Sequence, residues 1–249
     1  MHTILNVRDV TKVYKKGQTP SLHHVSFQVT EGEFIGIMGA SGSGKTTLLN
    51  VLSTIDKPTA GDVYLNKVNL NSLGDAQAAD FRRDHLGFIF QEYFLLDSLT
   101  IRENISVPLT LKRLPPQKIE AMVNELAQRF GIASQLEKYP GELSGGQRQR
   151  ASAARAIVKR PEILFADEPT GALDSNSATE LLSALHEANE ELNTTILMVT
   201  HDPYAASFAA RIFLFKDGCI YRELNKGKAP RRMFYERIVE EVAKLDTDR

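Results

Sequence analysis

The 249-residue sequence has little of several features that quickly assign a protein to a class. It contains one cysteine, Cys219, and no tryptophan. A single cysteine excludes a disulfide framework within the chain and agrees with a reducing compartment. The formal net charge is only −1. This balance gives no electrostatic reason to expect nucleic acid as the main partner, because duplex-binding proteins usually carry a clustered basic excess.

Long apolar runs are also missing. The N-terminal residues MHTILNVRDV lack the basic flank and apolar stretch of an export signal, and no segment approaches the roughly 20 apolar residues of a membrane span. We therefore expect a cytoplasmic chain that reaches a membrane only through a partner. The hydrophobic content of 42% is enough for one large domain, or for one domain with an inserted subdomain.

Strands and helices are predicted to alternate through most of the chain. Alternating or continuous apolar runs predict strands at residues 4–14, 25–29, Phe34–Met38, 163–166, 195–199 and 211–215. A helix is predicted over Ser175–Leu192 between two of these strands. This order favours a parallel sheet with helices on both faces.

The middle of the chain has helical periodicity from about residue 75 to residue 136. One helix face carries the apolar residues Ile119, Met122, Val123, Leu126 and Phe130. We interpret residues from about 91 to 143 as a helical subdomain inserted into an α/β domain of residues 1–226. Residues 227–249 form a C-terminal amphipathic extension, which either packs on its own domain or binds a partner or membrane surface.

A glycine-rich loop follows the strand predicted at Phe34–Met38. It fits the pattern G-x-x-x-x-G-K-[ST] of a phosphate-binding loop between a strand and a helix. Its backbone N–H groups and the positive end of the next helix attract phosphate. Lys45 is expected to reach the β- and γ-phosphates, and Thr46 to ligate Mg²⁺. The predicted ATP site comprises Gly39, Ala40, Ser41, Gly42, Ser43, Gly44, Lys45, Thr46 and Thr47.

Two adjacent carboxylates end the strand predicted at residues 163–166. Asp167 is placed to hold Mg²⁺ directly or through water, and Glu168 is placed to polarise the attacking water. An Asp-Glu pair at a strand end is weak evidence by itself, because charged residues often terminate strands. Beside a complete phosphate-binding loop, the pair predicts hydrolysis of the bound nucleotide.

A second glycine-rich segment, residues 143–147, opens a helix predicted at residues 147–159. A serine and two glycines at a helix N-terminus form a second anion site. One phosphate chain cannot easily occupy two helix N-termini of the same domain. We therefore expect a second copy of the chain to complete each site.

In this order, the motifs resemble those of the nucleotide-binding subunits of ABC transporters over nearly the whole chain. The matching residues are the phosphate loop, the Asp167–Glu168 pair, Tyr14, Gln91, residues 143–147, residues 172–174 and His201. The resemblance implies an α/β P-loop NTPase core with a parallel sheet, an N-terminal antiparallel β part and the inserted helical subdomain. It also implies a homodimeric ATPase that uses ATP and Mg²⁺ and binds a transmembrane permease at the inner face of the cell membrane.

The resemblance also implies a role for each matching residue. Tyr14 would stack on adenine; alone, it would be read as an ordinary strand aromatic. Gln91 would sense Mg²⁺ and the γ-phosphate, and His201 would contact that phosphate. The residues that would act on the opposite subunit or join the two sites are Ser144, Gly145, Gly146, Gln147 and Asp174. The implied catalytic residues are Lys45, Gln91, Glu168 and His201, and the implied metal ligands are Thr46, Gln91 and Asp167.

Within the family, several segments resemble the branch of the lipoprotein-release and macrolide-efflux ATPases. Residues 92–97, 198–203 and the C-terminal extension are most similar to the bacitracin-type antimicrobial-peptide resistance transporters. This implies a role in peptide resistance or export and in sensing, with a membrane sensor histidine kinase as a further partner through the permease. The alternative is the ATPase of a lipoprotein-release complex, or of a signalling or mechanotransmission complex that moves no small substrate.

Overall fold

A six-stranded sheet forms the centre of the protein, whose computed structural model describes residues 2–15 and 19–247. Its strand order is β10-β9-β3-β8-β7-β6. The strands are β3 (Phe34–Met38), β6 (Leu86–Ile89), β7 (Ile163–Asp167), β8 (Thr195–Thr200), β9 (Arg211–Lys216) and β10 (Cys219–Asn225). All neighbours pair in parallel except β9 and β10. The predicted parallel sheet is therefore confirmed, with one antiparallel edge strand.

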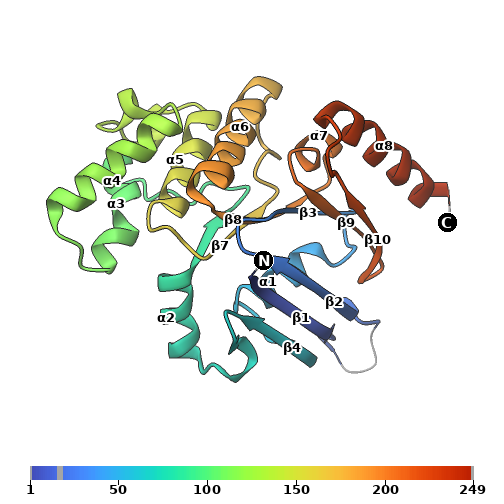
Figure 1. The fold of residues 1–249 in the computed structure, drawn as a ribbon. Helices are drawn as coiled ribbons and strands as arrows, with labels where there is room; N and C mark the ends of the chain where they lie inside the picture. Colours follow the sequence, from blue (N-terminus) through green and yellow to red (C-terminus); the bar gives the residue numbers. More distant parts are fainter. Residues whose placement is uncertain (1, 16–18, 248–249) are drawn as a thin grey trace.

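A smaller antiparallel sheet covers one face of this core. It contains β1 (Thr3–Lys12), β2 (Leu22–Thr30), β4 (Ala60–Leu65) and β5 (Val68–Asn69), in the order β2-β1-β4-β5. Helix α1 (Lys45–Leu52) lies between the two sheets (Figure 1). A helix therefore lies on each face of the central sheet, as predicted, but most of the cover on this face is the antiparallel sheet. The antiparallel β part is confirmed.

Alternating side chains of β3 separate two hydrophobic cores. Phe34 and Met38 belong to the core shared with the helices on one face, whereas Ile35 and Ile37 belong to the core shared with α1 and the antiparallel sheet. Because successive residues of a strand point to opposite faces, a strand buried on both sides must be apolar throughout. This explains why Phe34–Met38 has a continuous apolar run.

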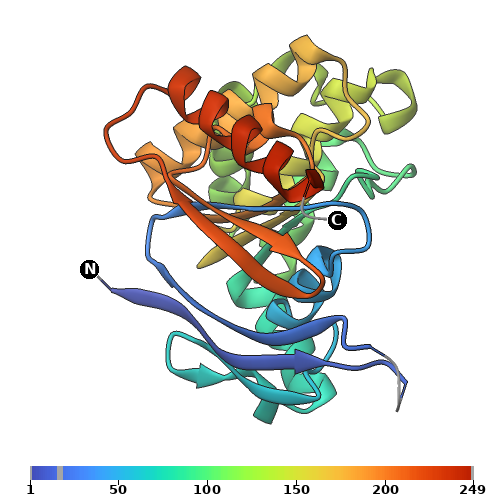
Figure 2. The ribbon, with the colours of Figure 1, turned by 90° about the vertical axis from the view of Figure 1, so that its right-hand side faces the viewer.

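The other face of the central sheet carries most of the helices (Figures 1 and 2). These are α3 (Ile101–Leu111), α4 (Pro116–Arg129), α5 (Gly145–Ile157), α6 (Ser175–Leu192), α7 (Pro203–Ala206) and α8 (Arg231–Thr247), while α2 (Asp75–His85) flanks β6. Short 3₁₀ turns occur at Leu70–Ser72, Ala133–Gln135 and Pro140–Glu142. The helical period predicted for residues 75–136 is interrupted by strand β6, whose four residues are too few for sequence periodicity to reveal.

The C-terminal helix α8 packs on its own domain. Phe234 and Ile238 are fully buried in the helical-side core, and the guanidinium of Arg231 lies over the Phe208 ring at 4.1 Å from its centroid. Its opposite face leaves Met233 and Val239 exposed. In residues 2–15 and 19–247, none of the helices is both long and apolar enough to cross a membrane.

Candidate functional site

The phosphate-binding loop turns sharply between β3 and α1. Two of its glycines cannot carry a side chain: a Cβ on Gly39 would lie 2.3 Å from the carbonyl oxygen of Phe215, and one on Gly44 would lie 2.3 Å from that of Ser21. Gly44 also has a φ of 103° at the N-cap of α1, a conformation that glycine adopts without strain. The loop backbone is therefore packed against β1–β2 and β9, with its N–H groups at the start of α1.

Lys45 lies inside the loop and bonds to its backbone. The Lys45 Nζ atom donates to the carbonyl oxygens of Gly39 at 2.8 Å and Ala40 at 2.9 Å. Burial lowers the pKa of this ammonium group, while the charges of Glu168 and Asp167 oppose that change. A buried cation close to two carboxylates is suited to bind the phosphates of a nucleotide.

Two carboxylates and a histidine meet at the ends of neighbouring strands. Strand β7 ends at Asp167 and is followed by Glu168, which has a positive φ of 47°. Residue His201 follows β8, and its Nδ1 atom lies 3.0 Å from Glu168 Oε2. The His201 backbone N–H also donates to that oxygen at 3.3 Å. Parallel strands place their carboxyl ends at one edge, which brings the two predicted catalytic residues together.

Asp167 has a buried oxygen that nothing in the described structure satisfies. Its Oδ1 atom has no hydrogen-bond partner, and burial, followed by the nearby Glu168 charge, raises the pKa of the carboxyl. A hard divalent cation such as Mg²⁺ would satisfy an orphaned carboxylate oxygen. In residues 2–15 and 19–247, no group of three or more His, Cys, Asp or Glu side chains is arranged to hold a metal. A Mg²⁺ ion at Asp167 therefore needs other oxygens, including those of phosphate.

The raised pKa of Asp167 leads to a stability prediction. The folded protein binds the proton of this carboxyl more tightly than the unfolded chain does. At a pH above the folded-state pKa, the ionised carboxylate therefore lowers the free energy of unfolding. This loss disappears as the pH falls through the folded-state pKa toward the pKa of the unfolded chain. We expect Asp167→Asn to raise the Tm of the nucleotide-free protein at pH 7 by about 2 °C, and the gain to shrink on acidification. Thermal unfolding followed by circular dichroism measures both effects.

The exposed carboxyl of Asp97 provides a control for this measurement. We expect Asp97→Asn to leave the Tm unchanged at either pH. A lower Tm for Asp167→Asn at pH 7 would show that the ionised carboxylate stabilises the nucleotide-free fold, contrary to its raised pKa.

A cavity of about 670 Å³ opens above the loop. The residues that line it come from the loop, α1, the end of β6 and the ends of β7 and β8: Ser21, Ala40, Ser41, Gly42, Gly44, Lys45, Thr46, Thr47, Gln91, Glu168 and His201. Gln91 reaches the cavity beside Gly171, where an added Cβ would lie 3.2 Å from the Gln91 side-chain amide carbon. Most of the site residues predicted from the phosphate loop and the strand ends thus surround one cavity.

The serine-glycine segment does not line this cavity. Ser144 caps α5, accepting a hydrogen bond from the Gln147 backbone N–H at 3.3 Å, while the Gln147 side chain accepts from the Ser144 N–H at 3.0 Å. This capping box starts the helix at Gly145, two residues before the predicted start. The segment is therefore a helix N-terminus that lies outside the cavity at the phosphate loop of its own chain.

Close packing joins this helix start to α6. A Cβ added to Gly146 would lie 2.4 Å from Ser177 Oγ. The N-cap residue of α6, Asp174, accepts from the Ser177 N–H at 2.9 Å and from its hydroxyl at 2.7 Å. These bonds hold the pKa of Asp174 below its usual value. Asp174 and the α5 N-terminus thus form one surface that is separate from the cavity.

Tyr14 also lies outside the lining of the cavity. It follows β1, and 57% of its surface is exposed. The Lys12 ammonium group lies over its ring, 4.9 Å from the centroid. The structure thus leaves Tyr14 accessible, but does not bring it against the phosphate loop.

Sequence reasoning missed two residues of α5 that connect the helix to the segment after β6. The Gln149 side chain donates to the carbonyl oxygens of Phe90 at 2.9 Å and Pro169 at 2.7 Å. Arg155 donates to the carbonyls of Tyr93 at 2.9 Å and Phe94 at 2.6 Å. Arg155 thus fastens α5 to the loop that follows β6. Nothing in the local sequence identifies the carbonyls that these side chains bind.

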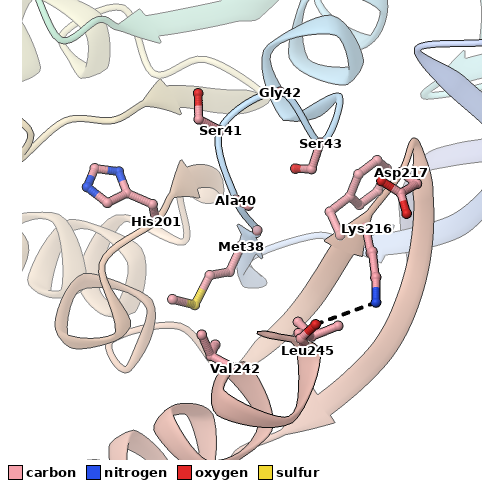
Figure 3. Close-up of a pocket in the computed structure, with 12 residues that line it drawn as sticks. Met38, Ala40, Ser41, Gly42, Ser43, His201, Lys216, Asp217, Val242 and Leu245 are labelled. Carbon is pink, nitrogen blue, oxygen red and sulfur yellow. Dashed lines mark hydrogen bonds between the residues drawn. The ribbon is translucent and has the colours of Figure 1, made fainter. Parts of the chain in front are cut away.

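The end of α8 lies across a pocket from the phosphate loop (Figure 3). Val242 and Leu245 border a second cavity of about 360 Å³, together with Met38, the outer side of the loop and His201. Lys216 Nζ donates to the Leu245 carbonyl at 3.5 Å. The C-terminal extension thus lines the same cavity as the loop and His201.

The family model and the similar proteins found by comparison agree on one family. A family model described as "ABC transporter" matches residues 22–171, more than half of the chain. The chain is 50% identical over 238 residues to the "Bacitracin export ATP-binding protein BceA" of Halalkalibacterium halodurans, covering 95% of this chain and 94% of that protein. It is 45% identical over 247 residues to the "ABC transporter ATP-binding protein YxdL" of Bacillus subtilis, covering 98% and 95%.

Solved structures agree with the sequence relatives. The fold is similar to the "Dimeric structure of a post-hydrolysis state of the ATP-binding cassette MJ0796 bound to ADP and Pi", with a TM-score of 0.81 and 38% identity. That similarity covers 89% of this chain and 98% of the other.

Proposed function

The chain belongs to the ABC transporter family as an ATP-binding and ATP-hydrolysing subunit, and we propose that it energises a permease for resistance to antimicrobial peptides of the bacitracin kind. The observation that carries the ATPase assignment is the meeting of Lys45, Glu168 and His201 at one cavity. The peptide assignment is supported by the 50% identity to the bacitracin export protein.

Two copies would bind two ATP molecules head to tail. The cavity of one chain supplies the phosphate loop, Gln91, Glu168 and His201. The α5 N-terminus, with Ser144, Gly145, Gly146 and Gln147, does not line that cavity and would bind the γ-phosphate held by the other chain. Asp174, packed beside this terminus through Ser177, would join the two sites. The dimeric structure of the similar cassette supports this arrangement.

Hydrolysis in this arrangement depends mainly on positioning and charge. Lys45 would exchange its two backbone carbonyl partners for phosphate oxygens, and Thr46, Gln91 and Asp167 would hold the Mg²⁺ that offsets phosphate charge. The Glu168 carboxylate would accept a proton from the attacking water or orient it. His201, bonded to the same carboxylate, would contact the γ-phosphate.

A groove at the border of the helical part offers a surface for the permease. The groove has a volume of about 370 Å³. Its apolar lining residues include Ile55, Phe88, Phe90 and Pro108, and its cationic lining residues are Arg82, Arg83, Arg155 and Lys159. Burial, and then the nearby Lys112 charge, lowers the pKa of Lys159 to about 8. We propose that a permease segment with apolar and acidic side chains occupies this groove, and that the adjoining region from Gln91 to about Pro108 transmits closure of the dimer to it.

Phe94 allows a test of this docking surface. It is 60% exposed with a φ of 45°, and asparagine tolerates this backbone conformation. We expect Phe94→Asn to reduce co-purification of the permease about tenfold, because it removes an exposed aromatic ring that packs against Phe90 of the groove, at 5.2 Å between centroids. The ATP affinity of the isolated chain should stay unchanged. Met233→Gln, at an equally exposed position on α8, is the control; an equal loss for both variants would remove the groove from this role.

The function itself is tested by isolating the complex from native membranes. A tagged chain should co-purify with a permease at one permease per two ATPase chains. Labelled peptide antibiotic should then accumulate in or leave vesicles in an ATP-dependent way. Recovery without a membrane protein would contradict the transporter assignment. Retention of a sensor histidine kinase, with ATP turnover but no movement of antibiotic, would favour the signalling alternative.

Location follows from the same proposal. The chain would lie at the inner face of the cell membrane, held there by the permease. Residues 1–226 would form the nucleotide-binding domain, with the helical subdomain of about residues 91–143 inserted in it. Residues 227–249 would form the extension.

A further inference from the structure

Lys12, the last residue of β1, makes three fixed contacts beside Tyr14. Its Nζ atom donates to Asp56 Oδ1 at 2.6 Å and to the Lys57 carbonyl at 2.7 Å, and it lies over the Tyr14 ring at 4.9 Å from the centroid. Only 12% of the Lys12 side chain is exposed. A lysine with a buried stem and two short hydrogen bonds is held in place, unlike most surface lysines.

Lys12 covers one face of the Tyr14 ring, while more than half of the tyrosine remains accessible. A cation over one face of an aromatic ring is attracted by the ring quadrupole, so Lys12 favours one orientation of the ring. The neighbouring backbone is fixed as well, because the Val13 N–H donates to Thr59 Oγ1 at 3.0 Å. With Tyr14 57% exposed, the ring can offer its uncovered face to a flat ligand.

The position of Asp56 connects this arrangement to the phosphate site. Helix α1 begins at Lys45 in the phosphate loop and ends at Leu52, and Asp56 follows four residues later. The helix that carries the phosphate-binding end thus leads to the carboxylate that fixes Lys12. Lys12, Asp56 and Tyr14 are therefore held in a constant relation to the loop, although Tyr14 itself lies outside the cavity lining.

We propose that Lys12, held by Asp56, is a positioning residue that orients Tyr14 for stacking on the adenine ring of ATP. The proposal rests on the adenine-stacking role that the resemblance to the family implies for Tyr14, and adds Lys12 as a group that sets the ring in place. Lys12 touches no part of the nucleotide in this arrangement. Because Lys12 orders the ring beforehand, Tyr14 loses less conformational entropy when the base stacks on it.

The test compares a ligand with a base and a ligand without one. We expect Lys12→Met to raise the Kd for ATP·Mg²⁺ about fivefold, the loss expected when one cation–π contact no longer orders the ring. The Kd for tripolyphosphate·Mg²⁺ should not change, because this ligand has no base. Lys12→Arg should keep ATP affinity within about twofold, since a guanidinium also binds a carboxylate and covers a ring. Titration calorimetry measures all three values.

Lys57→Met is the matched control. This neighbouring lysine donates to the Leu73 carbonyl, and its substitution changes the net charge equally. We expect the Lys57→Met variant to bind ATP·Mg²⁺ and tripolyphosphate·Mg²⁺ with the same Kd values as the unaltered protein. In steady-state hydrolysis, Lys12→Met should raise KM and leave kcat unchanged.

Tyr14→Ala separates the two parts of the proposal. Unchanged ATP binding by Tyr14→Ala would remove Tyr14 from the adenine site, and with it the role of Lys12. Weaker ATP binding by Tyr14→Ala together with unchanged binding by Lys12→Met would overturn the Lys12 proposal alone. An equal loss of ATP and tripolyphosphate binding by Lys12→Met would also overturn it, because it would show a general structural or charge effect.

Discussion

Glu168→Gln is expected to abolish turnover while preserving ATP binding. Glutamine fills the same space and keeps a hydrogen bond to the His201 backbone N–H, which lies 3.3 Å from Glu168 Oε2, but it cannot accept a proton. Loss of a general base lowers the rate by about 10²–10⁴-fold. With ATP trapped between two chains, the variant should accumulate as a dimer. Phosphate release and size-exclusion chromatography with ATP·Mg²⁺ measure the two effects.

A second carboxylate near the same strand gives the control. Glu162 precedes β7 and lies 2.6 Å from His85 Nδ1, at the opposite end of the strand from Glu168. We expect the Glu162→Gln variant to hydrolyse ATP at the same rate as the unaltered protein, with the same dependence of that rate on ATP concentration. Turnover by Glu168→Gln within tenfold of the unaltered protein would exclude Glu168 as the base.

Lys45→Ala is expected to give the largest loss of nucleotide affinity. The substitution removes a buried cation and its charge-assisted hydrogen bonds to phosphate, each of which contributes about 1.5–3 kcal/mol. Affinity for ATP·Mg²⁺ should therefore fall about 10- to 100-fold. The fold should remain intact, because the two carbonyl partners of Lys45 in the free protein lie in the loop itself. Equilibrium titration with ATP, together with a thermal melt, tests both statements.

Lys118→Ala serves as the comparison for this loss. Lys118 is an exposed lysine in α4 of the helical part, and alanine suits its helical position. We expect unchanged ATP affinity for this variant. ATP binding by Lys45→Ala at the unaltered affinity would contradict the assignment of the phosphate-binding loop.

The sequence by itself determined the chemistry and most of the secondary structure. The loop of residues 39–46 and the Asp167–Glu168 pair were identified because their function depends on residue types at fixed local spacing. The buried strands β3, β7 and β8 were identified because burial on both faces requires an unbroken apolar run. The helix Ser175–Leu192 was predicted with the bounds that the structure shows. These features follow from interactions over a few residues.

Several elements escaped this reasoning because their stability comes from distant partners. Strand β6 is apolar but has only four residues, too few to define a strand by periodicity. Strand β10 is an edge strand with mostly accessible side chains and has no clear apolar pattern. Helix α5 begins earlier than predicted because its capping box, and not its apolar face, sets its start. The cover of one sheet face by a second sheet depends on pairing between β1 and residues 10 to 60 positions away, from Lys12 with Leu22 to Leu5 with Leu65.

Only the tertiary structure decided how the functional groups are arranged. It brought Glu168 and His201 within hydrogen-bonding distance from two different strands, left Asp167 with an orphaned oxygen, and placed the α5 N-terminus outside the cavity at the phosphate loop of its own chain. It also placed Lys12 between Asp56 and Tyr14. These relations arise where strands and helices far apart in sequence pack together, and no local pattern encodes which side chains meet there.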